Sequence, residues 1–242
     1  MHIEVDGRPA TAEQVVSTDG HFTAMQVRGG GVQGLSHHLA RLDAAHREIF
    51  GQGLDGDRVR RLVRHALAGR ADASVRVVLR DPDHVAVQVA GPRRPPTLPQ
   101  RLRSVPYLRP FAHLKHLGGF AQAQWARQVG REGYDDALLV GPDGAVAEST
   151  IANVGLLGPA GEVTWPDAPH LRGTGLALVE ETTPSRTAAV HVDDLGRFAG
   201  AFLVNSIGIV AVASVDGVDL PDATRPVEEI RRRVAALPWQ VP

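Results

Sequence analysis

The sequence contains no cysteine, only one lysine and no long hydrophobic run. The absence of cysteine excludes disulfides, thiolate metal sites and a cysteine nucleophile. The most apolar stretch, residues 201–215, is interrupted by Asn205 and Ser206 and falls short of the roughly 18 uninterrupted apolar residues of a membrane-spanning helix, so it predicts buried strand. A formal net charge of −1 provides no broad cationic surface, which argues against nucleic acid as a partner.

The remaining composition is that of an ordinary globular protein. Of the 242 residues, 43% are apolar and 22% are charged, which is enough to bury a sizeable core. The length allows one large domain or two small domains that share a site. Because the sequence has no leading apolar segment, the protein is expected to be cytoplasmic and to have no membrane partner. The 11 histidines form no compact ligand motif, so no metal site is expected.

Hydrophobic periodicity predicts a mixture of helices and strands. Helices are expected over residues 36–50, 57–68, 117–131 and 227–237 and after Gly173, with Ser36 capping the first and Gly51 ending it. Strands are expected over residues 75–79, 85–89, 102–108, 137–140, 145–148, 151–157, 162–165, 188–192, 201–204 and 210–215. This pattern predicts an α/β protein of mixed α+β character with two domains, residues 1–108 and 109–242, and a site in the cleft between them.

The single lysine is the first candidate for chemistry. Of the 26 basic residues all but Lys115 are arginine, which stays protonated and cannot act as a nucleophilic amine. Lys115 lies in a largely apolar segment near an expected junction of strand and helix. In such surroundings a lysine amine can form an imine with a carbonyl cofactor, of which pyridoxal phosphate is the usual one. The alternative is an exposed lysine retained by chance.

A pyridoxal phosphate cofactor needs a carboxylate beside its ring nitrogen and donors for its phosphate. Glu148, at the end of an expected strand, is the candidate carboxylate, with a surface residue after a hairpin as the alternative. The segment Gly173-Thr174-Gly175 precedes an expected helix, whose N-terminal amides favour an anion. Residues 205–208 follow a buried strand and offer a hydroxyl and backbone amides. Arg41, on the inward side of its helix, would need an anionic partner.

Seven stretches of the sequence, several of which contain these candidate residues, match the motifs of one known family. They are Asp19-Gly20-His21-Phe22-Thr23-Ala24, His38-Leu39-Ala40-Arg41-Leu42, Leu114-Lys115-His116-Leu117, residues 133–139, residues 144–154, residues 169–174 and Val204-Asn205-Ser206-Ile207. Together they resemble the class IV aminotransferases, the fold-type IV pyridoxal phosphate enzymes, which include branched-chain and D-amino acid aminotransferases and aminodeoxychorismate lyase. The resemblance runs from about Asp19 to Gly217, and the spacing of 33 residues from Lys115 to Glu148 is its most specific signal.

The resemblance implies a homodimer that binds pyridoxal 5′-phosphate and a small-molecule amine or keto acid substrate. Lys115 would be the Schiff-base lysine and proton shuttle, and Glu148 the partner of the pyridine nitrogen. Asn153 would brace the site. The cofactor phosphate would be held by Arg41, Gly173, Thr174, Gly175, Ser206 and Ile207.

The sequence also departs from the family pattern. The N-terminal loop is shortened to Ser17-Thr18-Asp19-Gly20, the glycine turn reads Gly173-Thr174-Gly175-Leu176, and Phe120 stands where branched-chain enzymes carry a tyrosine. Amino-group transfer is the first hypothesis for function. Elimination of pyruvate from aminodeoxychorismate is the second, and a non-catalytic fold relic that binds a ligand is the third.

Overall fold

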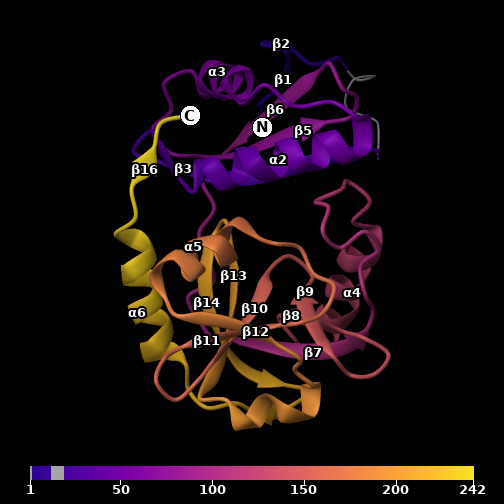
Figure 1. The fold of residues 1–242 in the computed structure, drawn as a ribbon, viewed down its shortest axis with the longest axis vertical. Helices are drawn as coiled ribbons and strands as arrows, with labels where there is room; N and C mark the ends of the chain where they lie inside the picture. Colours follow the sequence, from indigo (N-terminus) through magenta and orange to yellow (C-terminus); the bar gives the residue numbers. More distant parts are fainter. Residues whose placement is uncertain (1, 12–18) are drawn as a thin grey trace. The chain divides into compact units, whose positions relative to one another are not determined.

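The computed structural model describes residues 2–11 and 19–242 and divides the chain into two compact units (Figure 1). Unit 1 comprises Met1–Arg93, Leu114–Gly118 and Pro238–Pro242, and unit 2 comprises Arg94–His113 and Gly119–Leu237. Of the shortened N-terminal loop, Ser17 and Thr18 lie outside the described residues. Among those residues, no helix is long and apolar enough to cross a membrane.

These units differ from the expected division between residues 108 and 109. Strand β7 (Gln100–Pro106) pairs in parallel with β8 (Asp136–Val140), so residues before the expected boundary belong to unit 2. Lys115, expected in the C-terminal domain, lies in unit 1 instead. The reason is backbone pairing: the Phe22 amide donates to the Lys115 carbonyl at 2.9 Å, and the Leu117 amide donates to the Gly20 carbonyl at 2.9 Å.

Unit 1 is an antiparallel sheet with two helices on one face. Within the described part of this unit, seven strands follow the order β16-β4-β3-β5-β6-β1-β2. They are β1 (His2–Val5), β2 (Arg8–Pro9), β3 (His21–Arg28), β4 (Gly31–Gln33), β5 (Ala73–Leu79), β6 (Val85–Ala90) and β16 (Trp239–Gln240). Helices α2 (Leu35–Phe50) and α3 (Gly56–Leu67) share a buried core with Met25, Val27 and Val75 of the sheet. The hairpin of β5 and β6 and both helices confirm the pattern expected from the sequence.

The N-terminus of α2 corrects one expectation. Gly34, in the left-handed conformation, is the N-cap, and no side chain caps the helix from that position. Ser36 is already inside the helix, and its amide donates to the Gln240 side chain at 3.1 Å. Gly51 ends α2 with a φ of 75°, as expected, because glycine adopts the left-handed conformation without a Cβ clash.

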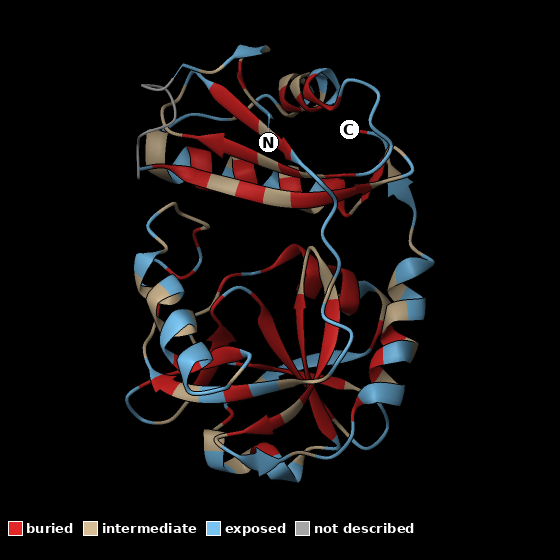
Figure 2. Cartoon of the chain, turned by 180° about the vertical axis from the view of Figure 1, so that it is seen from behind, coloured by how far each residue is buried: buried red, intermediate tan, exposed pale blue. Residues whose placement is uncertain are grey.

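Unit 2 is built on a sheet that closes on itself. The part of the sheet that the structure describes has nine strands. Eight of them follow the order β12-β11-β10-β13-β14-β7-β8-β9, β15 pairs with β14, and β9 also pairs with β10. Besides β7 and β8 they are β9 (Val146–Ser149), β10 (Asn153–Leu157), β11 (Val163–Pro166), β12 (Ser185–Ala188), β13 (Gly200–Asn205), β14 (Gly208–Val215) and β15 (Val218–Asp219). Figure 2 shows how deeply these strands are buried. The mixed α/β class predicted from the sequence is therefore confirmed.

The helices of unit 2 are α4 (Phe120–Arg131), α5 (Thr174–Thr182) and α6 (Thr224–Ala235), with a short 3₁₀ helix at Val192–Arg197. The strand expected over residues 188–192 is confirmed only in part, because β12 covers Ser185–Ala188 and His191 forms only an isolated bridge with Ala145. The edge strand β12 ends at Ala188 after pairing in parallel with β11, and from Val192 the chain winds into the 3₁₀ helix, where His191 caps the turn by accepting from the Asp193 amide. The expected helix over residues 117–131 starts only at Phe120, because Leu117 is paired with Gly20.

Candidate functional site

The segment that carries Lys115 runs beside the start of β3 in unit 1. The two backbone hydrogen bonds to Phe22 and Gly20 fix its path, and His116 forms an isolated bridge with His21. The Lys115 side chain is half-buried, and its Nζ lies 5.0 Å from the centre of the Phe22 ring. The only lysine amine of the chain is therefore held at a defined place against an aromatic face.

Arg41 lies on α2 and is hydrogen-bonded to Thr23 of β3. Its Nη2 donates to Thr23 Oγ1 at 2.6 Å, and Thr23 Oγ1 lies 2.7 Å from His38 Nδ1. Thr23 and His38 are fully buried. Burial, together with the nearby charges of Arg41, His37 and Lys115, holds the pKa of His38 well below its usual range, so His38 is neutral at pH 7. Two cations, Arg41 and Lys115, thus stand close to one neutral imidazole.

Arg76 is a third cation in unit 1, and like Lys115 it contacts the ring of Phe22. The guanidinium carbon of Arg76, on β5, lies 3.8 Å from the centre of the Phe22 ring. Arg76 Nε is buried and has no hydrogen-bond partner among the residues that the structure describes. Desolvation, with a smaller effect of Arg80, lowers the pKa of Arg76. A buried guanidinium nitrogen without a partner is costly, and an anionic ligand would relieve that cost.

Glu148 lies on β9 in unit 2, where it is 5% exposed. Its Oε1 accepts from Arg109 Nε at 3.0 Å, and its Oε2 accepts from the Leu171 amide at 3.2 Å. Arg109 is itself 7% exposed and donates through Nη2 to the Ala112 carbonyl. Counting only residues that the structure describes, each carboxylate oxygen has one protein donor and keeps capacity for a further hydrogen bond.

Sequence reasoning missed Arg109 as a part of this site. The general signal is that a buried carboxylate needs a cationic partner, but the pattern does not say which of the many arginines supplies it. Arg109 and Glu148 are 39 residues apart in the sequence, and only the closed sheet brings them together.

Asn153 lies directly opposite Glu148 in the pairing of β9 with β10. Its Nδ2 donates to the Leu171 carbonyl at 2.7 Å, while the Leu171 amide donates to Glu148. The backbone of Leu171 is thus held on both sides by neighbouring residues of the sheet. This fixes the chain two residues before Gly173, where α5 starts.

The N-terminus of α5 is formed by small, buried residues. Its N-cap is Gly173, and no side chain caps the helix. A Cβ at Gly173 would lie 2.1 Å from Asn153 Oδ1, and one at Gly175 would lie 2.7 Å from the Asn205 carbonyl oxygen, so both glycines permit a close approach of the helix end to the sheet. The first amides of a helix have no intrahelical acceptor and carry the positive end of its dipole. The buried Thr174 and Gly175 lie in this first turn.

We expect Gly175→Ala to lower the free energy of unfolding by about 1 to 3 kcal/mol, because the added methyl group would overpack the contact with Asn205 and Val204. Urea unfolding followed by circular dichroism measures the change. The matched control is Gly130→Ala in α4, where a Cβ meets nothing within 4 Å and alanine favours the helix. Equal stability of the Gly175 variant and wild type would contradict the prediction.

The turn between β13 and β14 lies next to the start of α5. Here the Ile207 amide donates to Asn205 Oδ1 at 2.8 Å, so the amide of this expected phosphate ligand already has an acceptor. Ser206 is partly exposed and presents its hydroxyl and amide at the same turn. The contact of Gly175 with Asn205 places this turn and the helix end side by side.

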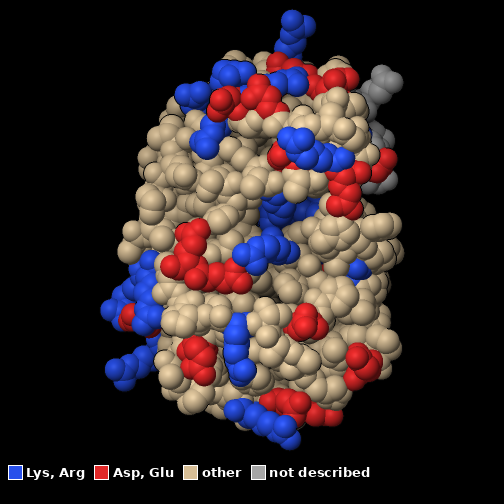
Figure 3. Space-filling model, viewed as in Figure 1, with Lys and Arg blue, Asp and Glu red and all other residues tan. Residues whose placement is uncertain are grey.

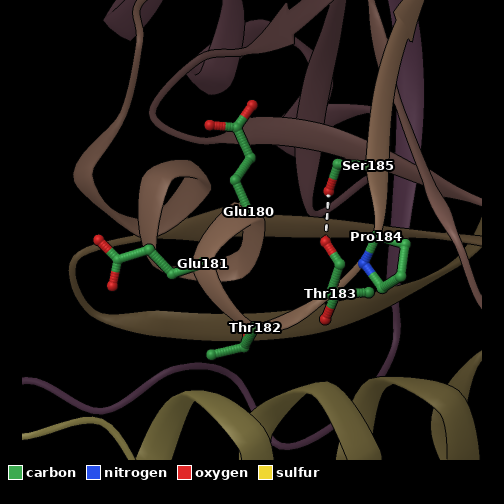
Figure 4. Close-up of a pocket in the computed structure, with 6 residues that line it drawn as sticks. All are labelled: Glu180, Glu181, Thr182, Thr183, Pro184 and Ser185. Carbon is green, nitrogen blue, oxygen red and sulfur yellow. Dashed lines mark hydrogen bonds between the residues drawn. The ribbon is translucent and has the colours of Figure 1, made fainter.

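A shallow hollow lies at the other end of α5. It is lined by Glu180, Glu181, Thr182, Thr183, Pro184 and Ser185, which Figure 4 shows as sticks. Two carboxylates and the negative end of the helix dipole disfavour a phosphate there. On the face shown in Figure 3, acidic and basic side chains are interspersed rather than separated into one large field. Of the two ends of α5, the N-terminus is therefore the one that favours an anion.

The expected site residues are distributed over both units. Unit 1 holds Arg41 and Lys115, and unit 2 holds Glu148, Asn153, Gly173, Thr174, Gly175, Ser206 and Ile207. Within unit 2 these residues gather at one end of the closed sheet through the contacts of Leu171, Gly173 and Gly175. No group of three or more histidine, aspartate or glutamate side chains suited to a metal ion occurs in the described portion of the chain.

Comparisons with known proteins give a consistent result. The sequence profile of the family described as "Amino-transferase class IV" matches residues 20–215. A search of curated proteins gives no match. A hypothetical aminotransferase from Mycobacterium tuberculosis is similar in structure in its PLP-bound form, with 23% identity, 98% of each chain covered and a TM-score of 0.82.

Two further solved structures represent different reactions. The 4-amino-4-deoxychorismate lyase from Pseudomonas aeruginosa is 26% identical, with 94% of this chain and 97% of that chain covered and a TM-score of 0.75. The branched-chain aminotransferase from the archaeon Thermoproteus uzoniensis, solved with norvaline, is 20% identical, with 97% of this chain and 94% of that chain covered and a TM-score of 0.77. The same fold thus occurs in proteins described as an aminotransferase and as a lyase.

Proposed function

The chain belongs to the class IV aminotransferase family, and we propose that it is an enzyme that uses pyridoxal 5′-phosphate to transfer an amino group between an amine or amino acid and a keto acid. The family resemblance seen in the sequence is confirmed, and enzymes of this family use this cofactor. The observation that carries the proposal is the position of the only lysine, whose amine stands against Phe22 in the same unit as Arg41 and Arg76.

The residues present fit this cofactor. Lys115 offers the amine, and Glu148 offers a buried carboxylate whose two oxygens each retain room for a hydrogen bond. The uncapped N-terminus of α5, with Gly173, Thr174 and Gly175, provides amides for a phosphate. Arg41 and Ser206 add a charge and a hydroxyl, and Asn153 braces the loop that leads to the helix.

When bound, pyridoxal 5′-phosphate supplies a reactive carbonyl carbon and a ring that accepts electrons. In the proposed mechanism Lys115 would hold the cofactor through its amine. The same amine would move the proton of the substrate α-carbon, acting as general base and afterwards as general acid. Glu148, fixed by Arg109 and the Leu171 amide, keeps a proton on the ring nitrogen.

The proposal is tested by titrating the purified protein with pyridoxal 5′-phosphate and recording its visible spectrum. We expect a band at about 410 to 420 nm that borohydride abolishes. The loaded protein is then incubated with an amino acid and a keto acid acceptor, and we expect one new amino acid for each donor consumed. Absence of the band at saturating cofactor would contradict the proposal and favour a ligand-binding relic of the fold.

Aminodeoxychorismate lyase is a second candidate function. It is favoured by the sequence Leu114-Lys115-His116-Leu117, which resembles the lyase branch, and by the 26% identity to the Pseudomonas lyase. Incubation with aminodeoxychorismate alone separates the two functions, because elimination releases pyruvate and 4-aminobenzoate without an acceptor. Transfer requires a keto acid.

The environment of Arg76 indicates a substrate with a carboxylate. The Arg76 guanidinium and the Lys115 amine lie 3.8 and 5.0 Å from the centre of the same ring, so the two cations share one aromatic contact. The buried Arg76 Nε would gain the hydrogen-bond acceptor that it lacks among the described residues. We therefore propose amino and keto acids, rather than simple amines, as the preferred substrates.

We expect Arg76→Gln to raise the KM for an amino acid donor by about 10- to 100-fold, because a charge-assisted hydrogen bond to a carboxylate is lost. Steady-state kinetics with an amino acid and with the corresponding amine that has no carboxylate measure the effect. The amine should react equally well with both proteins. Arg64→Gln, on the exposed side of α3, is the control. An equal loss for both donors would count against carboxylate recognition.

A homodimer is part of the same proposal. Unit 2 exposes the large apolar side chains of Phe111, Phe120 and Ile151, which are 70%, 76% and 62% exposed. A contiguous apolar patch marks a protein interface, and we propose that these side chains contribute to one. Light scattering coupled to size-exclusion chromatography determines the state of assembly.

A further inference from the structure

Thr23 lies between two side chains of α2 in unit 1. His38 and Arg41 are three residues apart, so both project from one side of the helix toward β3. The Thr23 hydroxyl oxygen is 2.6 Å from Arg41 Nη2 and 2.7 Å from His38 Nδ1. Thr23 is 0% exposed and His38 is 1% exposed, so water does not replace these contacts easily.

The chemistry of the three groups determines the direction of each hydrogen bond. A guanidinium group has donors only, so the Thr23 oxygen accepts from Arg41. Within the described residues, the Thr23 hydroxyl proton has one acceptor, His38 Nδ1. A neutral imidazole accepts at Nδ1 when its proton is on Nε2. The result is a chain in which His38 orients the Thr23 hydroxyl and the hydroxyl orients Arg41.

The Thr23 hydroxyl restricts the rotamers of Arg41. An arginine side chain has many rotamers, and ordering it on ligand binding costs free energy. A guanidinium already oriented by a hydroxyl avoids part of that cost when an anion binds.

We propose that Thr23, supported by His38, is a positioning residue that orients Arg41 toward the phosphate of the cofactor. This inference rests on the proposed function, in which Arg41 binds that phosphate. Thr23 itself acts through Arg41 and is not a catalytic residue.

The test compares two ligands that differ only in the phosphate, namely pyridoxal 5′-phosphate and pyridoxal. Their dissociation constants are measured by absorption titration for wild type, Thr23→Val and Thr23→Ser. We expect Thr23→Val to weaken binding of pyridoxal 5′-phosphate by about 3- to 10-fold, as for the loss of one hydrogen bond, and to leave pyridoxal binding unchanged. Thr23→Ser keeps the hydroxyl and should bind both ligands as wild type does.

A double-mutant cycle with Arg41→Gln identifies the route of the effect. If Thr23 acts through Arg41, Thr23→Val has no further effect on the dissociation constant in the Arg41→Gln background. Thr23→Ala serves as a second variant that also removes the hydroxyl, and thermal unfolding of each apoprotein shows that it is folded.

Several outcomes overturn the inference. Equal weakening of both ligands by Thr23→Val would indicate a general packing defect. Unchanged affinity, or full additivity with Arg41→Gln, would exclude a role through Arg41. In all of these cases the wild type still shows the visible band, so the proposed function survives. A wild-type protein without the band contradicts the proposed function, and this inference with it.

Discussion

Replacing Lys115 with arginine is expected to abolish the visible band of the cofactor-loaded protein and to lower turnover by at least about 10³-fold. Arginine keeps the positive charge against the Phe22 ring but is neither a nucleophile nor a base at neutral pH. General acid and base catalysis by a positioned group contributes about 10²- to 10⁴-fold, and loss of the covalent attachment adds to that effect. Absorption spectra and single-turnover kinetics measure the two losses separately.

The variant offers a sharp control, because the sequence contains no other lysine side chain. Borohydride treatment followed by peptide mass spectrometry should label the peptide with Lys115 in wild type and no peptide in Lys115→Arg. A band that persists in the variant, with label at a different residue, would show that Lys115 does not hold the cofactor.

Replacing Arg109 with glutamine is expected to lower the free energy of unfolding by about 3 to 5 kcal/mol. The change leaves Glu148 buried without its cationic partner, and breaking a buried ion pair from one side is strongly destabilising. For a chain of this size the melting temperature should fall by about 10 °C. Calorimetry of the apoprotein and of the loaded protein measures the loss.

Removal of both charges should restore much of the stability. In the double variant Arg109→Met/Glu148→Met no uncompensated charge is buried, and such replacements are often close to neutral. Arg101→Gln is the surface control, because the Arg101 side chain is 59% exposed in its pair with Asp135 and such pairs contribute about 0 to 1 kcal/mol. An Arg109→Gln variant as stable as the surface control would contradict the prediction.

Local patterns predicted the elements in which apolar residues dominate one face. Helix α3 and the hairpin of β5 and β6 are examples, since their apolar stripes match the core of unit 1. Strand β3 was not predicted. Its inward positions include His21 and Thr23 beside Met25 and Val27, so the polar residues interrupt the alternation that identifies a strand. Those polar positions are the ones that face His38 and His46.

In the candidate site, too, the sequence indicates individual residues but not the contacts between them. Lys115 was predicted as a site residue because it is the only lysine in the sequence, and Glu148 because it ends an expected strand 33 residues later. Both assignments stay predictions. Glu148 accepts a hydrogen bond from Arg109, which lies 39 positions away in the sequence. The Ser36 amide donates to the Gln240 side chain, which lies 204 positions away. Such contacts depend on the tertiary fold and leave no local pattern in the sequence. The placement of Lys115 in unit 1 was missed for the same reason.

Unit 1 is built from three separate segments of the chain, and this determines the order in which it can be completed on the ribosome. Its sheet and helices begin with the first residues, but Leu114–Gly118 joins it only after Arg94–His113 has been synthesised, and Pro238–Pro242 only after all of unit 2. Until then the Ser36 amide of α2 lacks Gln240, and β4 lacks its neighbour β16. The helix that carries Arg41 therefore reaches its final hydrogen bonding only after unit 2 has been synthesised.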